Sequence, residues 1–491
     1  MIHNIQKFGI VILSALMLSV IGVYVFYILY NAEWLIGDDA FLLRRTAMGI
    51  PFPFSESILP EIGFFRPFDY LHENIVLLFH SGTHSAFEHY IINAVSFVLC
   101  MGALIGILWK IIKPKEVCDY AIITFGTIAI ASRLIGVYIN IFGPIFGVYT
   151  YHMLAIFFLC IFLEKDKTWA MALSLFCWAY SMLIYENVCM VLGCMGLFPL
   201  LLAYKQLSKN QKIYNYTLIG MAVAFIVTYV YVIYFPTRGQ SHYDPAHDTG
   251  VGLIDNAWTM IYGQKFIWVA ALVWFWRQVQ LVRKQTTYHI LYDTLLWAAG
   301  GMVIGAIVLR LDWAMYYYDA IILSLPAIVY FLINSHTKYG KYVALGVMML
   351  FAAWHSVKVP HLIEKNQKDR IVTSANMHLI AEKALNGWSI VWYDGCRQDS
   401  VSEVRKAWRK EATRNYIQYL MKDIKWDYGA ELKEYSVVFN PYENEIKGDI
   451  PEYCKDKIKT EVGETSGVVY YEIENDNYGY KNENIGSSAG I

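Results

Sequence analysis

Charged residues are scarce in this chain. Asp, Glu, Lys and Arg make up only 16% of its 491 residues, whereas hydrophobic residues make up 57%. Soluble domains carry about 25% charged and about 45–50% apolar residues. A water-soluble protein with this composition would expose much of its apolar surface, so the scarcity of charge excludes an ordinary soluble enzyme. The mean hydropathy of +0.36 agrees with this conclusion.

An excess of one charge sign is also missing. The net charge is -1 and the isoelectric point is near 6.9. The average charge therefore points neither to nucleic acid nor to anionic lipid as a partner. The chain also lacks internal repeats. Its only biased segment is the Asn-, Gly- and Ser-rich end, 474–491, which we expect to be disordered.

The apolar residues gather in about eleven stretches, each near the 20 residues that a helix needs to cross a bilayer. The first stretch is too long for a signal peptide and has no small-residue cleavage site, so we predict a retained span. The predicted spans are 9–30, 87–109, 119–139, 145–163, 168–185, 187–204, 214–235, 259–276, 290–309, 316–334 and 341–357.

Basic residues follow every second stretch, which is the pattern of loops on the cytoplasmic side of a membrane. This alternation predicts a cytoplasmic N-terminus. It places the long loop after the first span, and everything after the last span, outside the cytoplasm. The basic loops carry Lys110, Lys113, Lys115, Lys165, Lys167, Lys205, Lys209, Lys212, Arg277, Arg283, Lys284, Lys338 and Lys341.

The composition becomes polar after the last stretch. We therefore predict an α-helical polytopic membrane protein with two parts, a transmembrane domain over 1–357 and a small extracytoplasmic α+β domain over 358–491, flexible from about 474. In the second part we expect a helix around 401–423 and strands near 388–393, 435–440 and 467–473.

Only two of the eight cysteines, Cys396 and Cys454, lie in the polar C-terminal part. The predicted topology places them in a compartment that can be oxidising, so they can form a disulfide or remain two separate buried thiols. The other six lie in or beside the predicted spans, where we expect them to act as small hydrophobic residues. They are Cys100, Cys118, Cys160, Cys177, Cys189 and Cys194.

Ionisable residues near the membrane fall on one predicted side, the outer one. Such residues are costly at membrane depth and often functional. We predict a polar, charge-bearing cavity at the outer face, although outer loops are polar in general. Glu186 fits that simpler explanation poorly, because the turn Tyr185-Glu186-Asn187 lies between two long apolar runs. The group comprises Asp38, Asp39, Arg44, Arg45, Glu61, Arg66, Asp69, His72, Glu73, Arg133, His152, Glu186, Arg238, His242, Asp244, Arg310 and Asp312.

The first outer loop has signals for two short helices that would lie in the membrane interface. One begins at Asp38 and ends near Gly49, and the other covers Phe68 to Phe79. Asp38 can serve simply as the N-cap of the first helix. The adjacent Asp39 makes two carboxylates, more than a single cap needs.

The chain resembles the GT-C superfamily of membrane glycosyltransferases, which use polyprenyl-phosphate-linked sugars as donors. The resemblance rests on the acidic pair directly after the first span, the interfacial helices of the outer loop and the mid-chain outer Glu186. The segments Arg66-Pro67-Phe68-Asp69-Tyr70 and 84–93 are similar to the part that leads into the second span. Motifs cover about residues 1–205, and topology alone covers 206–357. The C-terminal part matches no module.

The resemblance implies a role for each candidate residue. Asp38 would be the general base on the acceptor hydroxyl, and Asp39 would assist it. Cationic groups would stabilise the departing phosphate, although each arginine can also be an interfacial anchor. The phosphate candidates are Arg66, Arg310, Arg133 and Arg238, and the candidates around the acceptor are Glu186, His242, Asp244, Asp69 and His72. Relatives differ in their need for a divalent cation, so Mg or Mn stays an open prediction.

We therefore expect a glycosyltransferase that moves one sugar from a polyprenyl phosphate to a glycan, lipid or protein acceptor on the extracytoplasmic face. A bacterial inner membrane is preferred, with a role in modifying a cell-envelope polysaccharide. The alternatives are a lipid-linked glycan flippase or transporter, a glycan polymerase, and a non-enzymatic envelope assembly protein. A transporter would place its charges near the membrane midplane in repeated halves, which this sequence does not show.

Overall fold

The computed structural model describes mainly helices, their short connections and one pair of short strands in the first three quarters of the chain, and strands alone in the last quarter. The described residues are 2–30, 32, 51, 58–59, 64–68, 70–78, 86–140, 148–237, 257–258, 265–308, 318–335, 339–367, 389–392, 428–429, 436–439, 458–465 and 468–473. The chain forms two compact units. One comprises Met1–Ala32 and Pro51–Glu364, and the other comprises Glu33–Ile50 and Lys365–Ile491.

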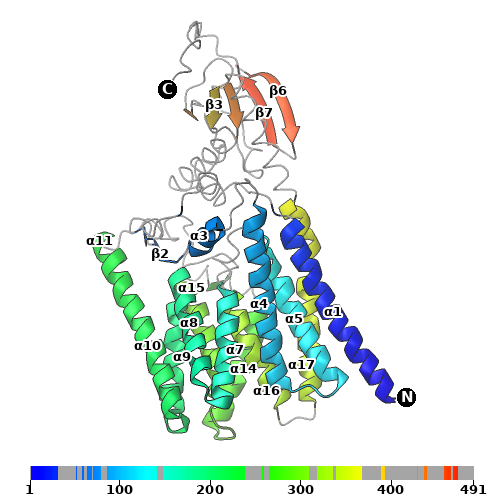
Figure 1. The fold of residues 1–491 in the computed structure, drawn as a ribbon, viewed down its shortest axis with the longest axis vertical. Helices are drawn as coiled ribbons and strands as arrows, with labels where there is room; N and C mark the ends of the chain where they lie inside the picture. Colours follow the sequence, from blue (N-terminus) through cyan, green and yellow to red (C-terminus); the bar gives the residue numbers. More distant parts are fainter. Residues whose placement is uncertain are drawn as a thin grey trace. The chain divides into compact units, whose positions relative to one another are not determined.

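The first unit is a bundle of helices that run up and down beside one another (Figure 1). Each predicted apolar stretch overlaps one of its helices. The long elements are α1 (Ile2–Tyr30), α4 (Phe87–Ile112), α5 (Val117–Tyr138), α7 (Tyr149–Lys165), α8 (Thr168–Ile184), α9 (Val188–Leu202), α10 (Lys209–Tyr229), α14 (Lys265–Val282), α15 (Tyr292–Val308), α16 (Tyr318–Ile333) and α17 (Gly340–Ser356). The short ones are β1 (Ile58–Leu59), β2 (Phe64–Phe65), α3 (Leu71–Leu78), η3 (Tyr204–Gln206), η4 (Val230–Tyr234) and α11 (Phe235–Thr237).

The chain is a helical membrane protein. Within the described residues, 5 helical segments are long and apolar enough to cross a bilayer: Gln6–Tyr30, Phe87–Ile112, Val117–Tyr138, Lys209–Tyr234 and Gly340–Gln367. Shorter apolar helices cover Thr168–Ile184, Val188–Leu202, Phe266–Val282 and Ala320–Ile333. Many large apolar side chains on these helices are exposed, as expected of a surface that faces lipid.

Ion pairs join the helices at one end of the bundle. Lys341 at the start of α17 contacts both Glu116 and Asp119 at the start of α5, each with an N–O distance of 2.9 Å. Lys110 near the end of α4 pairs with Glu164 near the end of α7. The predicted basic loops therefore meet at a common end, called the basic end below. It contains the α4–α5, α7–α8, α9–α10, α14–α15 and α16–α17 connections.

The helices α3 and α14 differ in how well they match the sequence predictions. The predicted interfacial helix over 68–79 contains α3, which spans Leu71–Leu78. The predicted span 259–276 is misplaced, because α14 begins at Lys265 and continues through Arg277 to Val282. The predicted span ended just before Arg277, but the helix continues because the charge of Arg277 is neutralised inside the protein.

The described part of the second unit is a mixed five-stranded sheet of order β4-β3-β5-β7-β6. The strand β3 (Ser389–Trp392) pairs in parallel with β4 (Tyr428–Gly429) and β5 (Ser436–Phe439). The strand β7 (Val468–Ile473) pairs antiparallel with β5 and with β6 (Ile458–Thr465). Three of these strands match the predicted ones. The predicted helix at 401–423 and the predicted tail from 474 lie outside the described residues.

Candidate functional site

Arg66 follows a small hairpin directly. Strands β1 and β2 pair antiparallel, with Ile58 opposite Phe65 and Leu59 opposite Phe64. The Phe65 ring packs 5.4 Å from the Phe225 ring of α10, centroid to centroid. The hairpin thus holds the start of the Arg66-Pro67-Phe68 segment against the bundle, and the Arg66 side chain is buried with it.

Glu186 lies in the tight turn between α8 and α9, at the end opposite the basic end. The turn is closed by the Val188 amide, which donates to the Tyr185 carbonyl oxygen at 3.1 Å. The Phe68 amide donates to the Leu183 carbonyl oxygen, also at 3.1 Å. This backbone bond brings the Arg66 segment alongside the turn, although 120 residues separate Arg66 from Glu186.

The two side chains form a bidentate ion pair. The Arg66 Nε donates to Glu186 Oε2 at 2.6 Å, and Nη2 donates to Oε1 at 3.1 Å. The Arg66 side chain is 8% exposed and that of Glu186 is 19% exposed. A charge-assisted fork of this kind fixes both position and orientation. It uses one edge of the guanidinium, Nε–Nη2, and directs the Nη1 corner away from the carboxylate.

Aromatic residues surround this pair. The Arg66 guanidinium lies over the Tyr185 ring, 5.3 Å from its centroid. Asn187 Nδ2 donates to the Tyr185 hydroxyl at 3.1 Å, which holds that ring in place. The charges of Arg66 and Glu186 both act on Tyr229, the last residue of α10. The site is thus an ion pair in a partly dry, aromatic setting, where charge interactions are stronger than in water.

A π-helical turn follows Tyr229. In η4 the Phe235 amide donates to the Val230 carbonyl oxygen, five residues back. Pro236 follows at once, and its ring would clash with the carbonyl four residues before it in a regular α-helix. The wider π turn relieves that clash. Such turns recur at functional sites, and this one contacts β2, the strand that directly precedes Arg66.

Arg133 lies in a different aromatic setting from Arg66. Its guanidinium is over the Tyr318 ring, 4.2 Å from the centroid. The Tyr149 ring is 6.1 Å from the Tyr318 ring. Arg133 therefore points into the bundle between α5, α7 and α16 rather than outward as an interfacial anchor. His152, on α7, has its ring centroid 5.0 Å from that of Trp178.

The structure thus brings together Arg66 and Glu186 among the predicted site residues. The side chain of His72, a residue of α3, is not described. The remaining predicted residues lie outside the described ranges: Asp38, Asp39, Asp69, Arg238, His242, Asp244, Arg310, Cys396 and Cys454. Within the described ranges no group of three or more His, Cys, Asp or Glu side chains could hold a metal ion. The divalent cation, Mg or Mn, stays a prediction.

No protein-family model matches the chain, and no curated protein matches it.

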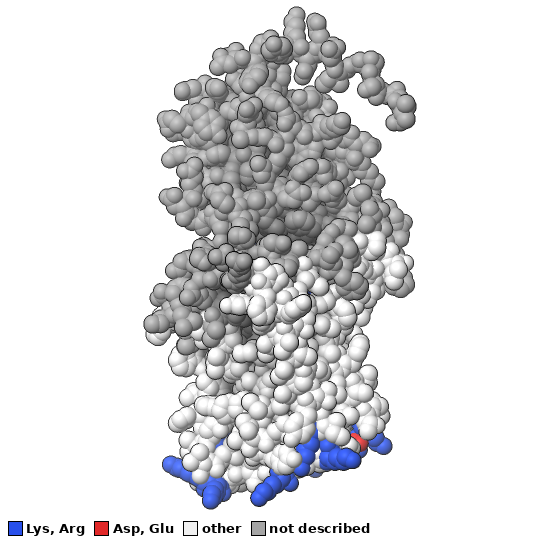
Figure 2. All heavy atoms as spheres, turned by 90° about the vertical axis from the view of Figure 1, so that its left-hand side faces the viewer, with Lys and Arg blue, Asp and Glu red and all other residues white. Residues whose placement is uncertain are grey.

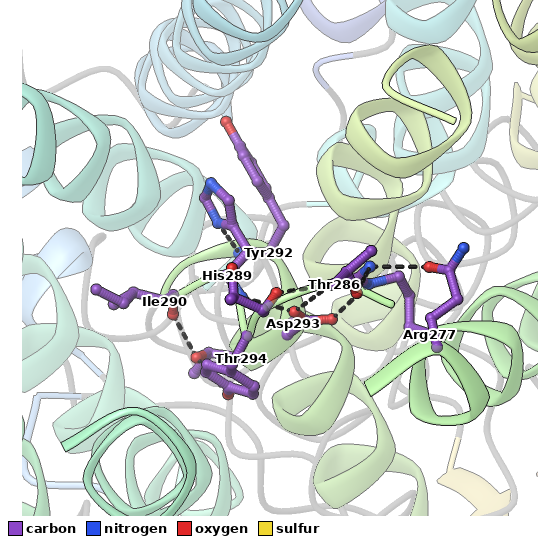
Figure 3. Close-up of polar contacts among 10 residues, drawn as sticks. Arg277, Thr286, His289, Ile290, Tyr292, Asp293 and Thr294 are labelled. Atoms are coloured by element: carbon purple, nitrogen blue, oxygen red, sulfur yellow. Dashed lines mark hydrogen bonds and ion pairs between the residues drawn. The ribbon is translucent and has the colours of Figure 1, made fainter. Parts of the chain in front are cut away.

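A second buried polar cluster lies at the basic end, between α14 and α15 (Figure 3). Arg277 is 4% exposed and Asp293 is fully buried. The Arg277 Nε donates to Asp293 Oδ1 at 3.0 Å, and Nη2 donates to Oδ2 at 2.8 Å. The prediction that Arg277 is a loop cation is wrong, because Arg277 lies within α14. The signal that could have revealed the pair is the opposite charge of Asp293, just across a short loop between two apolar runs.

Every N–H of the Arg277 guanidinium has an acceptor. Besides the two bonds to Asp293, Nη1 donates to Gln280 Oε1 and to Thr286 Oγ1, both at 2.9 Å, and Nη2 donates to the Thr287 carbonyl oxygen at 3.3 Å. The guanidinium carbon lies 4.1 Å from the centroid of the Phe331 ring. Five satisfied donors leave no donor for a substrate, so this cluster stabilises the α14–α15 connection.

His289 is the last residue of this cluster, and its burial should make the stability of the protein depend on pH. Its Nδ1 accepts a bond from the Tyr292 amide at 3.3 Å, and its ring packs 4.6 Å from those of Tyr292 and Tyr330. Burial lowers the pKa of His289 to about 4. Because the unfolded chain binds this proton near pH 6.5, stability should be full above pH 6.5 and fall as the pH drops towards 4, by at most about 3 kcal/mol.

Thermal unfolding of the full chain in detergent at pH 7.5, 6.5, 5.5 and 4.5 measures this effect. His289→Gln, which does not titrate, should lose that part of the pH dependence. The exposed His361→Gln should keep it. Equal pH slopes for the wild type and His289→Gln would contradict the prediction.

Proposed function

We propose that the chain is a membrane glycosyltransferase of the GT-C type. It moves one sugar from a polyprenyl phosphate to a glycan, lipid or protein acceptor on the extracytoplasmic face. The observation that carries the proposal is the buried Arg66–Glu186 pair. It joins the loop after the first helix to the mid-chain acidic turn, the two segments on which the resemblance to this superfamily rests.

The proposed topology has eleven spans, with the N-terminus and the basic end in the cytoplasm of a bacterial inner membrane. The basic loops, which the bundle collects at one end, support this orientation through the positive-inside rule. The C-terminal unit is then an extracytoplasmic α+β domain, and its sheet supplies the β part.

In the proposed reaction the acceptor hydroxyl oxygen attacks the anomeric carbon and inverts it. Asp38 takes the hydroxyl proton, assisted by Asp39. The bond from the anomeric carbon to the phosphate oxygen breaks, and polyprenyl phosphate leaves with the bonding electrons. Arg66, oriented by Glu186, stabilises the negative charge that develops on that phosphate. Arg133, Arg238 and Arg310 are the further phosphate candidates, and Asp69, His72, His242 and Asp244 lie around the acceptor.

Transfer assays test this proposal. Membranes that contain the full chain are supplied with radiolabelled polyprenyl-phosphate sugars, and the label is followed into lipid, glycan and protein fractions. Asp38→Asn should lower transfer by about 100-fold or more, because a general base contributes on the order of 10²–10⁴. Asp39→Asn should have a smaller effect. Asp166→Asn, exposed at the basic end, is the matched control and should transfer at the wild-type rate.

Full transfer by both Asp38→Asn and Asp39→Asn would remove the proposed base. Movement of a lipid-linked glycan across liposomes by the purified protein, with no new glycosidic bond, would replace the transferase with a transporter.

A further inference from the structure

Five lysines gather on neighbouring connections at the basic end. Lys165 and Lys167 flank the α7–α8 turn, and Lys205, Lys209 and Lys212 lie on η3 and the start of α10. We call these five residues the lysine rim. Figure 2 shows lysine and arginine side chains concentrated at this end of the bundle, with almost no acidic surface among them. All but Lys212 are exposed, and Lys212 is partly exposed.

The two connections are held together, so the lysine rim is a defined surface. Asp166 has a left-handed backbone, with φ of 50°, and turns the chain from α7 directly into α8. Its Oδ2 accepts a bond from Asn210 Nδ2 of α10 at 3.2 Å. The Lys212 ammonium lies over the Tyr204 ring, 4.0 Å from the centroid. The cations thus stay grouped although they come from two separate stretches of sequence.

Negative charge on the lysine rim is low. The nearby carboxylates are Asp166, already bound to Asn210, and Glu164, already paired with Lys110 of α4. Further exposed cations lie on other connections of the same end, namely Lys113, Lys115, Arg283 and Lys284. A strong positive potential therefore remains at this end, although the whole chain has a net charge of -1.

Exposed aromatic side chains accompany the lysine rim. Trp169 at the start of α8, Tyr204 of η3 and Tyr216 of α10 are 52%, 47% and 55% exposed. Trp and Tyr take this position at the boundary between lipid tails and headgroups. The lysines of the same connections then lie at the depth of the lipid phosphates, where each ammonium can bind one.

We propose that the lysine rim binds anionic phospholipid headgroups of the leaflet that it faces. The average charge of the chain gave no reason to expect such a partner. The partner is indicated by the grouping of lysines at the basic end, because basic clusters beside membrane helices attract anionic lipids. This proposal does not depend on the transferase chemistry, because it concerns the opposite end of the bundle from Arg66 and Glu186.

Lipid association measured by electron paramagnetic resonance tests the proposal. The purified full chain is reconstituted in phosphatidylcholine vesicles with spin-labelled phosphatidylglycerol or spin-labelled phosphatidylcholine. We expect phosphatidylglycerol to associate at least about threefold more strongly at low salt, and this preference to shrink in 0.5 M NaCl. The variant K165Q/K167Q/K205Q/K209Q should lose half of the preference or more. The control K358Q/K365Q carries its changes at the other end of α17 and should keep it.

Equal association of the two lipids with the wild type would overturn the proposal, as would an unchanged preference in the four-lysine variant. Displacement of the spin-labelled lipid by millimolar glycerol phosphate would also overturn it, because the surface would then bind a free phosphate. If the four-lysine variant does not fold, K165Q/K167Q and K205Q/K209Q are measured separately, and each should lower the preference.

Discussion

Asp293→Asn should destabilise the protein by about 3–5 kcal/mol, the usual cost of removing one partner from a buried ion pair. The Asp293 side chain is 0% exposed and that of Arg277 is 5% exposed. The substitution keeps the size of the side chain but leaves the guanidinium charge buried without its counter-ion. Denaturant unfolding of the full chain in detergent, followed by tryptophan fluorescence, measures the loss.

The matched control for Asp293→Asn is Glu164→Gln, which breaks the exposed Lys110–Glu164 pair at the same end of the bundle. An exposed pair contributes up to about 1 kcal/mol, so this variant should unfold near the wild-type midpoint. The double variant R277M/D293L removes both charges and should recover part of the stability that Asp293→Asn loses. If Asp293→Asn and Glu164→Gln lose the same free energy of unfolding, the buried pair stabilises the protein no more than the exposed pair does.

Arg66→Gln should lower sugar transfer by about 10²–10³, the usual effect of removing one donor that stabilises developing negative charge. Glu186→Gln should lower transfer less, because it leaves the guanidinium in place but loosens its orientation. The transfer assay in membranes described above measures both rates. Thermal unfolding of each variant separates loss of activity from loss of fold.

The exchange variant R66E/E186R distinguishes a phosphate-binding role from a purely structural one. It rebuilds an ion pair between the hairpin and the α8–α9 turn, so the unfolding temperature should return towards the wild-type value. It also places a carboxylate where the proposed phosphate binds, so transfer should stay low. Recovery of both stability and transfer would mean that Arg66 and Glu186 only fasten the loop to the bundle.

The positions of the bundle helices could be predicted closely wherever an apolar run ends in a polar loop. The predicted span 168–185 corresponds to α8 at Thr168–Ile184, and the predicted span 87–109 to α4 at Phe87–Ile112. Hydropathy failed at α14, since the partner that neutralises Arg277 lies 16 residues further along the chain. The strand β6 was missed because only Ile458 and Val462 among its eight residues are large and apolar, so it forms no apolar run.

The residues of the candidate site could be predicted from the sequence, but which of them contact one another could not. Arg66 and Glu186 each stand out as charges beside apolar segments, but no local pattern pairs residues 120 positions apart. Their pairing depends on the hairpin β1–β2 and on the Phe68–Leu183 backbone bond, which are tertiary features. The grouping of the lysine rim depends in the same way on the Asn210–Asp166 bond between separate connections.

All five N–H donors of the Arg277 guanidinium are hydrogen-bonded within the protein, and this affects how the chain inserts into the membrane. Inserting α14 alone would bring an unpaired arginine to the membrane, and inserting α15 alone would bring an unpaired Asp293. An unpaired charge costs about 2.5–3.5 kcal/mol at a helix centre, which is the upper bound for these two residues near helix ends. All the acceptors of Arg277 come from the end of α14, from the loop and from Asp293. The two helices should therefore leave the insertion machinery as a closed hairpin, with the first retained until the second has been synthesised.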